Sequence, residues 1–108
     1  MHAGVLLEAL EAGVITKGDI HRVCPHPINP CVVELTGRQL EETVKRAFTK
    51  ELRQLELKGF GFRGKVLGQM IFTGIEVDVT AESVHSITIL GEKLRADQIY
   101  SIATLDMY

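Results

Sequence analysis

The chain has 108 residues with 12 basic and 14 acidic side chains, so its formal net charge at pH 7 is -2. Hydrophobic residues make up 45% of the chain and charged residues 24%, which is typical of one globular domain. This charge argues against a nucleic-acid-binding or membrane-surface module, because such modules cluster Lys and Arg. No apolar run is long enough to cross a bilayer, and the first residues lack the basic and apolar regions of a signal peptide. The two cysteines leave the cellular compartment open.

The first third of the chain predicts two short helices and a loop. Apolar residues at helical spacing predict a helix over Val5–Ala12, and Gly13 follows where a C-cap glycine would stand. Thr16 with Asp19 three residues later is a capping-box pattern and predicts a second, short helical turn. All three prolines of the chain lie in Cys24–Pro30, which excludes helix and central strand there and predicts a stiff loop.

The middle of the chain predicts one strand and one long helix. Cys31–Leu35 is rich in β-forming residues, and Thr36 with Gln39 is a second capping-box pattern. Apolar residues spaced three and four apart then predict an amphipathic helix over Gly37–Leu55. Four glycines in Lys58–Gly68 predict a flexible excursion.

The last third predicts strands over Met70–Val79, Val84–Leu90 and Ile99 to about Met107, with a tight turn at Gly91-Glu92. We therefore expect an α+β fold in a single domain over residues 1–108. Its mixed or antiparallel sheet has about four strands, ends in an antiparallel meander, and carries the long helix and a short N-terminal helix packed on it.

Three segments carry further patterns whose order and spacing extend over most of the chain. Ala3–Ile20 (AGVLLEALEAGVITKGDI) is similar to "N-x-G-x-x-R, then G-x-I-T-x-x-D". Cys24–Val44 (CPHPINPCVVELTGRQLEETV) is similar to "P-F-x-N, strand, T-G, helix", and Gly91–Tyr108 (GEKLRADQIYSIATLDMY) to "G-x-x-L-x-x-x-x-x-Y-x-V-A-T". Together they resemble the C-terminal domain of the 5'-nucleotidase family, and the Pro-His-Pro-Ile-Asn-Pro loop resembles its bacterial metallophosphoesterase branch.

This resemblance implies a division of labour between two domains. In the family, an N-terminal calcineurin-like domain holds two divalent metal ions and hydrolyses the phosphoester, while the C-terminal domain recognises the substrate and closes against the metal site. We therefore expect neither catalytic residues nor a metal in this chain. The expected partners are an N-terminal metallophosphoesterase domain of the same polypeptide and a nucleotide or other phosphoester, with no nucleic acid and no membrane.

The resemblance also implies that the chain begins inside the first motif and stops before the segment that carries a base-stacking aromatic in the family. We expect such a truncated domain to leave apolar surface and strand edges uncovered, and therefore to associate as a homodimer or swapped assembly.

By the same resemblance, the substrate-binding residues are His26, Ile28 and Asn29 on the proline-rich loop. His26 stands where the family has a stacking Phe, so a substrate other than a nucleotide stays open. An imidazole can stack on a base or donate a hydrogen bond to a phosphate. The alternative is a solvent-exposed histidine with no role in binding.

A second interpretation, from a different class, is a stand-alone binding or interaction module that holds zinc. His21, Cys24, His26 and Cys31 are residue types of a tetrahedral zinc site, but their spacing H-x2-C-x-H-x4-C matches no standard ribbon or finger. The two cysteines can equally form a disulfide or be small buried apolar residues. Glycines, aromatics and basic residues in Lys58–Lys65 similarly allow an RNA-stacking strand, a phosphate loop or a plain surface loop.

Overall fold

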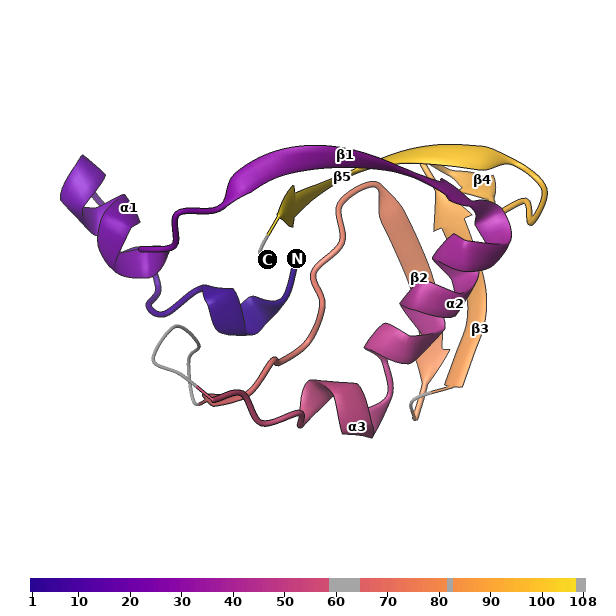
Figure 1. Cartoon of the computed structure of the whole chain (residues 1–108), viewed down its shortest axis with the longest axis horizontal. Coiled ribbons are helices and arrows are strands. Elements are labelled where there is room, and N and C mark those ends of the chain that lie inside the picture. Colours follow the sequence, from indigo (N-terminus) through magenta and orange to yellow (C-terminus); the bar gives the residue numbers. More distant parts are fainter. Residues whose placement is uncertain (59–64, 82, 107–108) are drawn as a thin grey trace.

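The computed structural model describes residues 1–58, 65–81 and 83–106. These ranges contain both helices and antiparallel strands, with most of the strands after the helices, which confirms the α+β class (Figure 1). In chain order the elements are η1 (Ala3–Val5, a 3-10 helix), α1 (Lys17–Val23), β1 (Asn29–Thr36), α2 (Gly37–Ala47), α3 (Lys50–Arg53), β2 (Ile75–Thr80), β3 (Ser83–Ile89), β4 (Glu92–Lys93) and β5 (Ile99–Asp106). None of the described helices is long and apolar enough to cross a membrane.

The strands form two antiparallel sheets and not one. β1 pairs with β5 in a two-stranded ribbon that runs from Asn29 opposite Asp106 to Thr36 opposite Ile99. β2, β3 and β4 form the second sheet in that order. The predicted meander is therefore wrong at its last step, because β5 leaves its sequence neighbours and joins β1 (Figure 1).

The tight turn between β3 and β4 lies one position earlier than the predicted Gly91-Glu92. Leu90 and Gly91 are the two loop residues, with φ angles of 50° and 85°, and Ile89 pairs with Glu92 across the turn. Two central residues with positive φ are the mark of a type I′ turn, whose twist matches that of antiparallel strands. A glycine at the second position makes this turn accessible, while Leu90 adopts the left-handed conformation at some cost.

Both predicted capping boxes are confirmed. The Thr16 hydroxyl accepts a hydrogen bond from the Asp19 amide at 3.2 Å, and the Asp19 carboxylate accepts one from the Thr16 amide at 2.8 Å. Thr36 and Gln39 make the same reciprocal pair at the start of α2, at 3.3 and 2.9 Å. These bonds satisfy amides that a helix start otherwise leaves without a partner.

The long helix predicted over residues 37–55 is interrupted. α2 ends at Ala47, and a new helix, α3, begins at Lys50. Thr49 stands between them, where its hydroxyl donates a hydrogen bond to the Arg46 carbonyl at 2.8 Å and accepts one from the Leu52 amide at 3.4 Å. The threonine therefore ends one helix and caps the next, which apolar spacing alone does not reveal.

The helix predicted over Val5–Ala12 is wrong. The 3-10 helix η1 overlaps this stretch only at Val5, and the backbone on both sides of Val5 bonds to distant parts of the chain. The Ala3 amide donates to the Gln69 carbonyl at 2.8 Å, and the Leu7 amide donates to the Val23 carbonyl at 2.8 Å. Gly4 lies so close to the carbonyls of residues 66 and 67 that a Cβ at this position would collide with them.

The core is small for a chain of this length. Leu40 and Val44 of α2 pack against Ile87 of β3, and partly buried apolar residues from both sheets surround them. The radius of gyration is 15.5 Å, whereas a compact domain of this length has about 13 Å. Large apolar side chains stay exposed as a result, among them Val14 at 93%, Val32 at 69% and Ile99 at 63%.

Two sequence interpretations fall on residues outside the described ranges. The excursion predicted over Lys58–Gly68 contains residues 59–64, and the last predicted strand was placed to about Met107. β5 is described up to Asp106, close to the predicted end.

Candidate functional site

The proline-rich loop joins α1 to β1 and is attached at both of its ends. At the first end, Cys24 caps α1 and its amide donates a hydrogen bond to the Ile20 carbonyl at 2.9 Å. At the other end, the Asn29 amide donates to the Asp106 carboxylate at 2.7 Å, and these two residues are paired in the ribbon. Prolines fix the backbone between the anchors, so few loop conformations are available.

The three residues predicted to bind substrate all lie on this loop or at its end. His26 and Ile28 are half-buried, and Asn29, the first residue of β1, is exposed. Because the Asn29 backbone amide is bonded to Asp106, its backbone position is fixed by the far end of the chain. The loop therefore offers one imidazole and one carboxamide within four positions of each other.

The residues considered for zinc are described, but they do not assemble into a metal site. His21 is exposed on α1, while Cys24 and Cys31 are half-buried free thiols with no disulfide between them. Within residues 1–58, 65–81 and 83–106, no three His, Cys, Asp or Glu side chains are grouped so that they could hold a metal ion.

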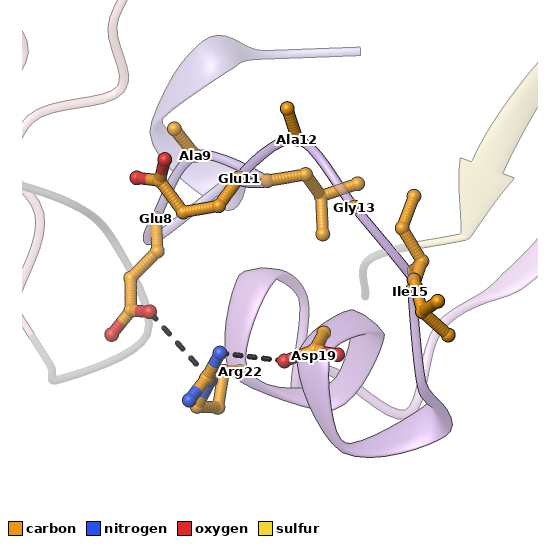
Figure 2. A pocket seen from close by; sticks show the side chains of 10 residues that line it. Glu8, Ala9, Glu11, Ala12, Gly13, Ile15, Asp19 and Arg22 are labelled. Atoms are coloured by element: carbon orange, nitrogen blue, oxygen red, sulfur yellow. Dashed lines mark hydrogen bonds and ion pairs between the residues drawn. The ribbon is translucent and has the colours of Figure 1, made fainter.

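A polar hollow of about 310 Å³ lies between residues 8–15 and α1 (Figure 2). Arg22 lies in its lining, and the guanidinium pairs with the Asp19 carboxylate at 2.7 Å and the Glu8 carboxylate at 3.9 Å. Glu11 adds a further acidic group to the lining. Two carboxylates thus compensate the guanidinium, and the described residues of the hollow offer no excess positive charge for a phosphate.

Hydrogen bonds from Thr16, and secondarily the Arg22 cation, lower the pKa of Asp19 below its ordinary value. The folded pKa is depressed, so the carboxylate contributes to stability above its ordinary pKa, and that contribution is lost only as the pH falls through the lowered value. The capping box of α1 is therefore intact at neutral pH.

A larger cavity of about 680 Å³ lies under the ribbon. It is walled by the inner faces of β1 and β5, by α2, and by residues 70–75, and it reaches Met1 and His2 on one side. Most lining side chains are apolar. The pKa of His2 is lowered, first by burial and then by the neighbouring N-terminal charge, which favours a neutral imidazole.

One sequence pattern indicates this cavity, although it does not identify the residues opposite β1. Cys31, Val33 and Leu35 alternate along β1 and all line the cavity, as a strand with one apolar face predicts. Asp106 also lines it, and the same carboxylate holds Asn29. The end of the proline-rich loop therefore lies at the edge of the cavity.

Comparisons with known proteins agree with the resemblance carried by the three motifs. Residues 1–108 match the family described as 5'-nucleotidase, C-terminal domain. A protein of Bacillus subtilis (strain 168), named "Uncharacterized metallophosphoesterase YunD", is 45% identical over 113 aligned residues. The alignment covers 100% of this chain and 24% of the relative, so the chain spans about a quarter of that protein's length. The match extends over the whole sequence, and the chain belongs to the 5'-nucleotidase C-terminal domain family.

Proposed function

We propose that residues 1–108 form one domain, the substrate-recognition domain of a metal-dependent phosphoesterase that hydrolyses nucleotides or related phosphoesters. The observation that carries this proposal is the family match over the full chain, supported by a relative whose name includes metallophosphoesterase. That relative is about four times longer than the aligned region, which leaves ample length for a separate catalytic domain. On this proposal, the chain binds substrate and a second domain performs the hydrolysis.

We assign the chemistry to an N-terminal metallophosphoesterase domain of the same polypeptide. Two divalent metal ions in such a domain would activate a water molecule and stabilise negative charge on the transferred phosphoryl group. The residues of this chain would hold the non-reacting part of the substrate and orient the phosphoester toward that domain.

Within the chain, we assign substrate contact to His26, Ile28 and Asn29. The loop is supported at both ends, by the α1 cap at Cys24 and by the Asn29–Asp106 hydrogen bond, so a ligand would not have to order it. His26 can stack on a planar group or donate a hydrogen bond, Ile28 supplies apolar contact, and the Asn29 carboxamide can both donate and accept.

The test of this assignment is His26→Ala in the complete polypeptide, with kinetics on a panel of nucleotides and simple phosphoesters. Loss of a contact shared by ground and transition states should raise KM while kcat changes little. His21→Ala is the matched control, because His21 is an exposed histidine on the neighbouring helix. A large fall in kcat at constant KM would place His26 in the chemistry, and unchanged kinetics would remove it from the site.

A second experiment tests the division of labour. The 108-residue chain should release no phosphate above background when Mn²⁺, Mg²⁺, Co²⁺ or Zn²⁺ is added, because the catalytic metal ions belong to the other domain. Metal-stimulated turnover that persists through repeated purification would contradict the proposal.

A further inference from the structure

The cavity beneath the β1–β5 ribbon exposes apolar side chains that a folded protein normally covers. Val33 is 38% exposed, Ile71 is 45% exposed and Met1 is 40% exposed, and all three line the cavity. With a volume of about 680 Å³, the cavity is far larger than a packing defect. Contiguous exposed apolar surface of this kind marks a site that another group covers.

The lining indicates what kind of group this is. The described lining residues include no Lys or Arg. Asp106 is the only acidic side chain among them, and its carboxylate already accepts a hydrogen bond from the Asn29 amide. The N-terminal amine of Met1 donates to the Ile71 carbonyl at 3.0 Å. The described walls therefore offer an anionic small molecule such as phosphate no Lys or Arg to pair with. The complementary group is therefore one with apolar side chains.

The position of the cavity indicates where such a group comes from. Met1, His2 and Asp106 all line the cavity, so both ends of the described chain reach it. The relative extends well beyond the aligned region, because the alignment covers only 24% of that protein. Polypeptide attached at either end would enter the cavity directly, at high effective concentration.

We propose that the cavity is the seat of an apolar segment of the same polypeptide that lies outside residues 1–108. Branched aliphatic or aromatic side chains of that segment fill the space between the ribbon and residues 70–75, and so complete a core that is small in this chain. This inference rests on the longer polypeptide of the proposed function, but it does not require that the polypeptide hydrolyse a phosphoester.

The two native cysteines provide a built-in test. Both are half-buried free thiols, but Cys31 lines the cavity and Cys24 does not. The rate at which a small maleimide labels each thiol is measured by peptide mass spectrometry, in the 108-residue chain and in the complete polypeptide. Covering the cavity should slow labelling of Cys31 by about tenfold or more, since the reagent then needs a local opening. Labelling of Cys24 should change little.

Three results would overturn the proposal. The first is an equal labelling rate of Cys31 in both proteins. The second is protection of Cys31 in the short chain that grows with its concentration, because the occupant would then be a second copy. The third is protection of Cys31 in the short chain that disappears once a bound small molecule has been extracted under denaturing conditions, because the occupant would then be that molecule. The thiol measurement does not use enzymatic activity, so protection without phosphate release would reject the proposed function and keep the docked segment.

A charge placed in the cavity gives an independent measurement. Ile71→Glu should leave the melting temperature of the short chain nearly unchanged, since the side chain is 45% exposed there. In the complete polypeptide it should lower Tm, because the carboxylate would be buried under the docked segment. Val32→Glu is the matched control, since Val32 alternates with the cavity-lining Val33 on β1 and is 69% exposed. Equal effects of the two substitutions in both proteins would contradict the proposal.

Discussion

Gly37 shows how a single residue fixes the junction between the ribbon and the main helix. It is the first residue of α2, directly after β1, and its amide donates a hydrogen bond to the Gln98 carbonyl at 2.7 Å. The next amide, of Arg38, donates to the Ala96 carbonyl at 3.1 Å. The backbone therefore lies against residues 95–98, and a Cβ on Gly37 would collide with the Arg95 carbonyl oxygen.

We expect Gly37→Ala to destabilise the chain by about 2 kcal/mol or more, because the obstacle is backbone and cannot rotate away. Gly18→Ala is the matched control, since the nearest atom to a Cβ there is the Thr16 hydroxyl at 3.6 Å, an ordinary contact. In α1 the alanine should instead favour the helix slightly. Urea unfolding followed by circular dichroism measures both, and equal midpoints for the two variants would refute the collision.

At the scale of the elements, the two capping boxes are chemically similar but hold helices of unequal importance. α2 buries Leu40, Val44 and Ala47 in the core, whereas α1 buries no residue. We therefore expect loss of the α2 cap to destabilise the whole fold, because α2 packs in the core. Loss of the α1 cap should only loosen α1 locally.

Thr36→Ala should lower the free energy of unfolding by about 1 kcal/mol, the usual cost of removing an N-cap side chain. Thr16→Ala should fray α1 and leave the unfolding midpoint almost unchanged. Amide hydrogen exchange of α1 and chemical unfolding of the whole chain separate local from global loss. A shift of the midpoint by Thr16→Ala as large as that by Thr36→Ala would show that α1 is part of the core unit.

The elements that could be predicted from sequence are those that local chemistry determines. The capping residues, the loop stiffened by proline and the strand predicted at Cys31–Leu35, which lies inside β1, depend on neighbours a few positions away. The helix expected at Val5–Ala12 does not form: the amides of the two residues before it bond to residues 69 and 67, and within it the Leu7 amide bonds to the Val23 carbonyl. The predicted meander is wrong at β5 for a similar reason. Its partner β1 is distant in the sequence, and alternation of apolar residues does not identify a partner strand.

The candidate site divides in the same way. The proline-rich loop and its His26 could be identified from sequence, because proline composition and family motifs are local patterns. The cavity could not, because its walls come from Met1 and His2, β1, α2, residues 70–75 and β5. Long-range pairing brings them together, β1 with β5 and His2 with Met70.

At the scale of the whole molecule, exposed apolar surface predicts self-association of the 108-residue chain. Within the described part of the chain the ribbon has two strands and no strand pairs with either outer edge, and Val32 and Ile99 are among its exposed side chains. Free edges and apolar surface favour pairing with another copy. Sedimentation velocity over a range of concentrations should show a concentration-dependent dimer.

Val32→Thr should weaken this association, since it replaces exposed apolar surface while retaining a β-branched side chain. Thr88→Val is a useful comparison on the other sheet, where it should have no such effect. A monomer over the whole concentration range would mean that the exposed surface does not drive association, and the prediction would then be wrong.

The pairing of β1 with β5 also has a consequence for synthesis on the ribosome. β1 ends at Thr36 and β5 begins at Ile99, so at about 5–20 residues per second the synthesis of β5 begins on the order of 3–13 s after β1 is complete. During that time the strand is an exposed edge on a growing chain. Pro30, which lacks an amide to donate, and the charged Glu34 lie on this strand, and both residue types discourage pairing with a neighbouring nascent chain. The ribbon thus forms only after β5 has been synthesised. Until then, Pro30 and Glu34 disfavour pairing of β1 with another nascent chain.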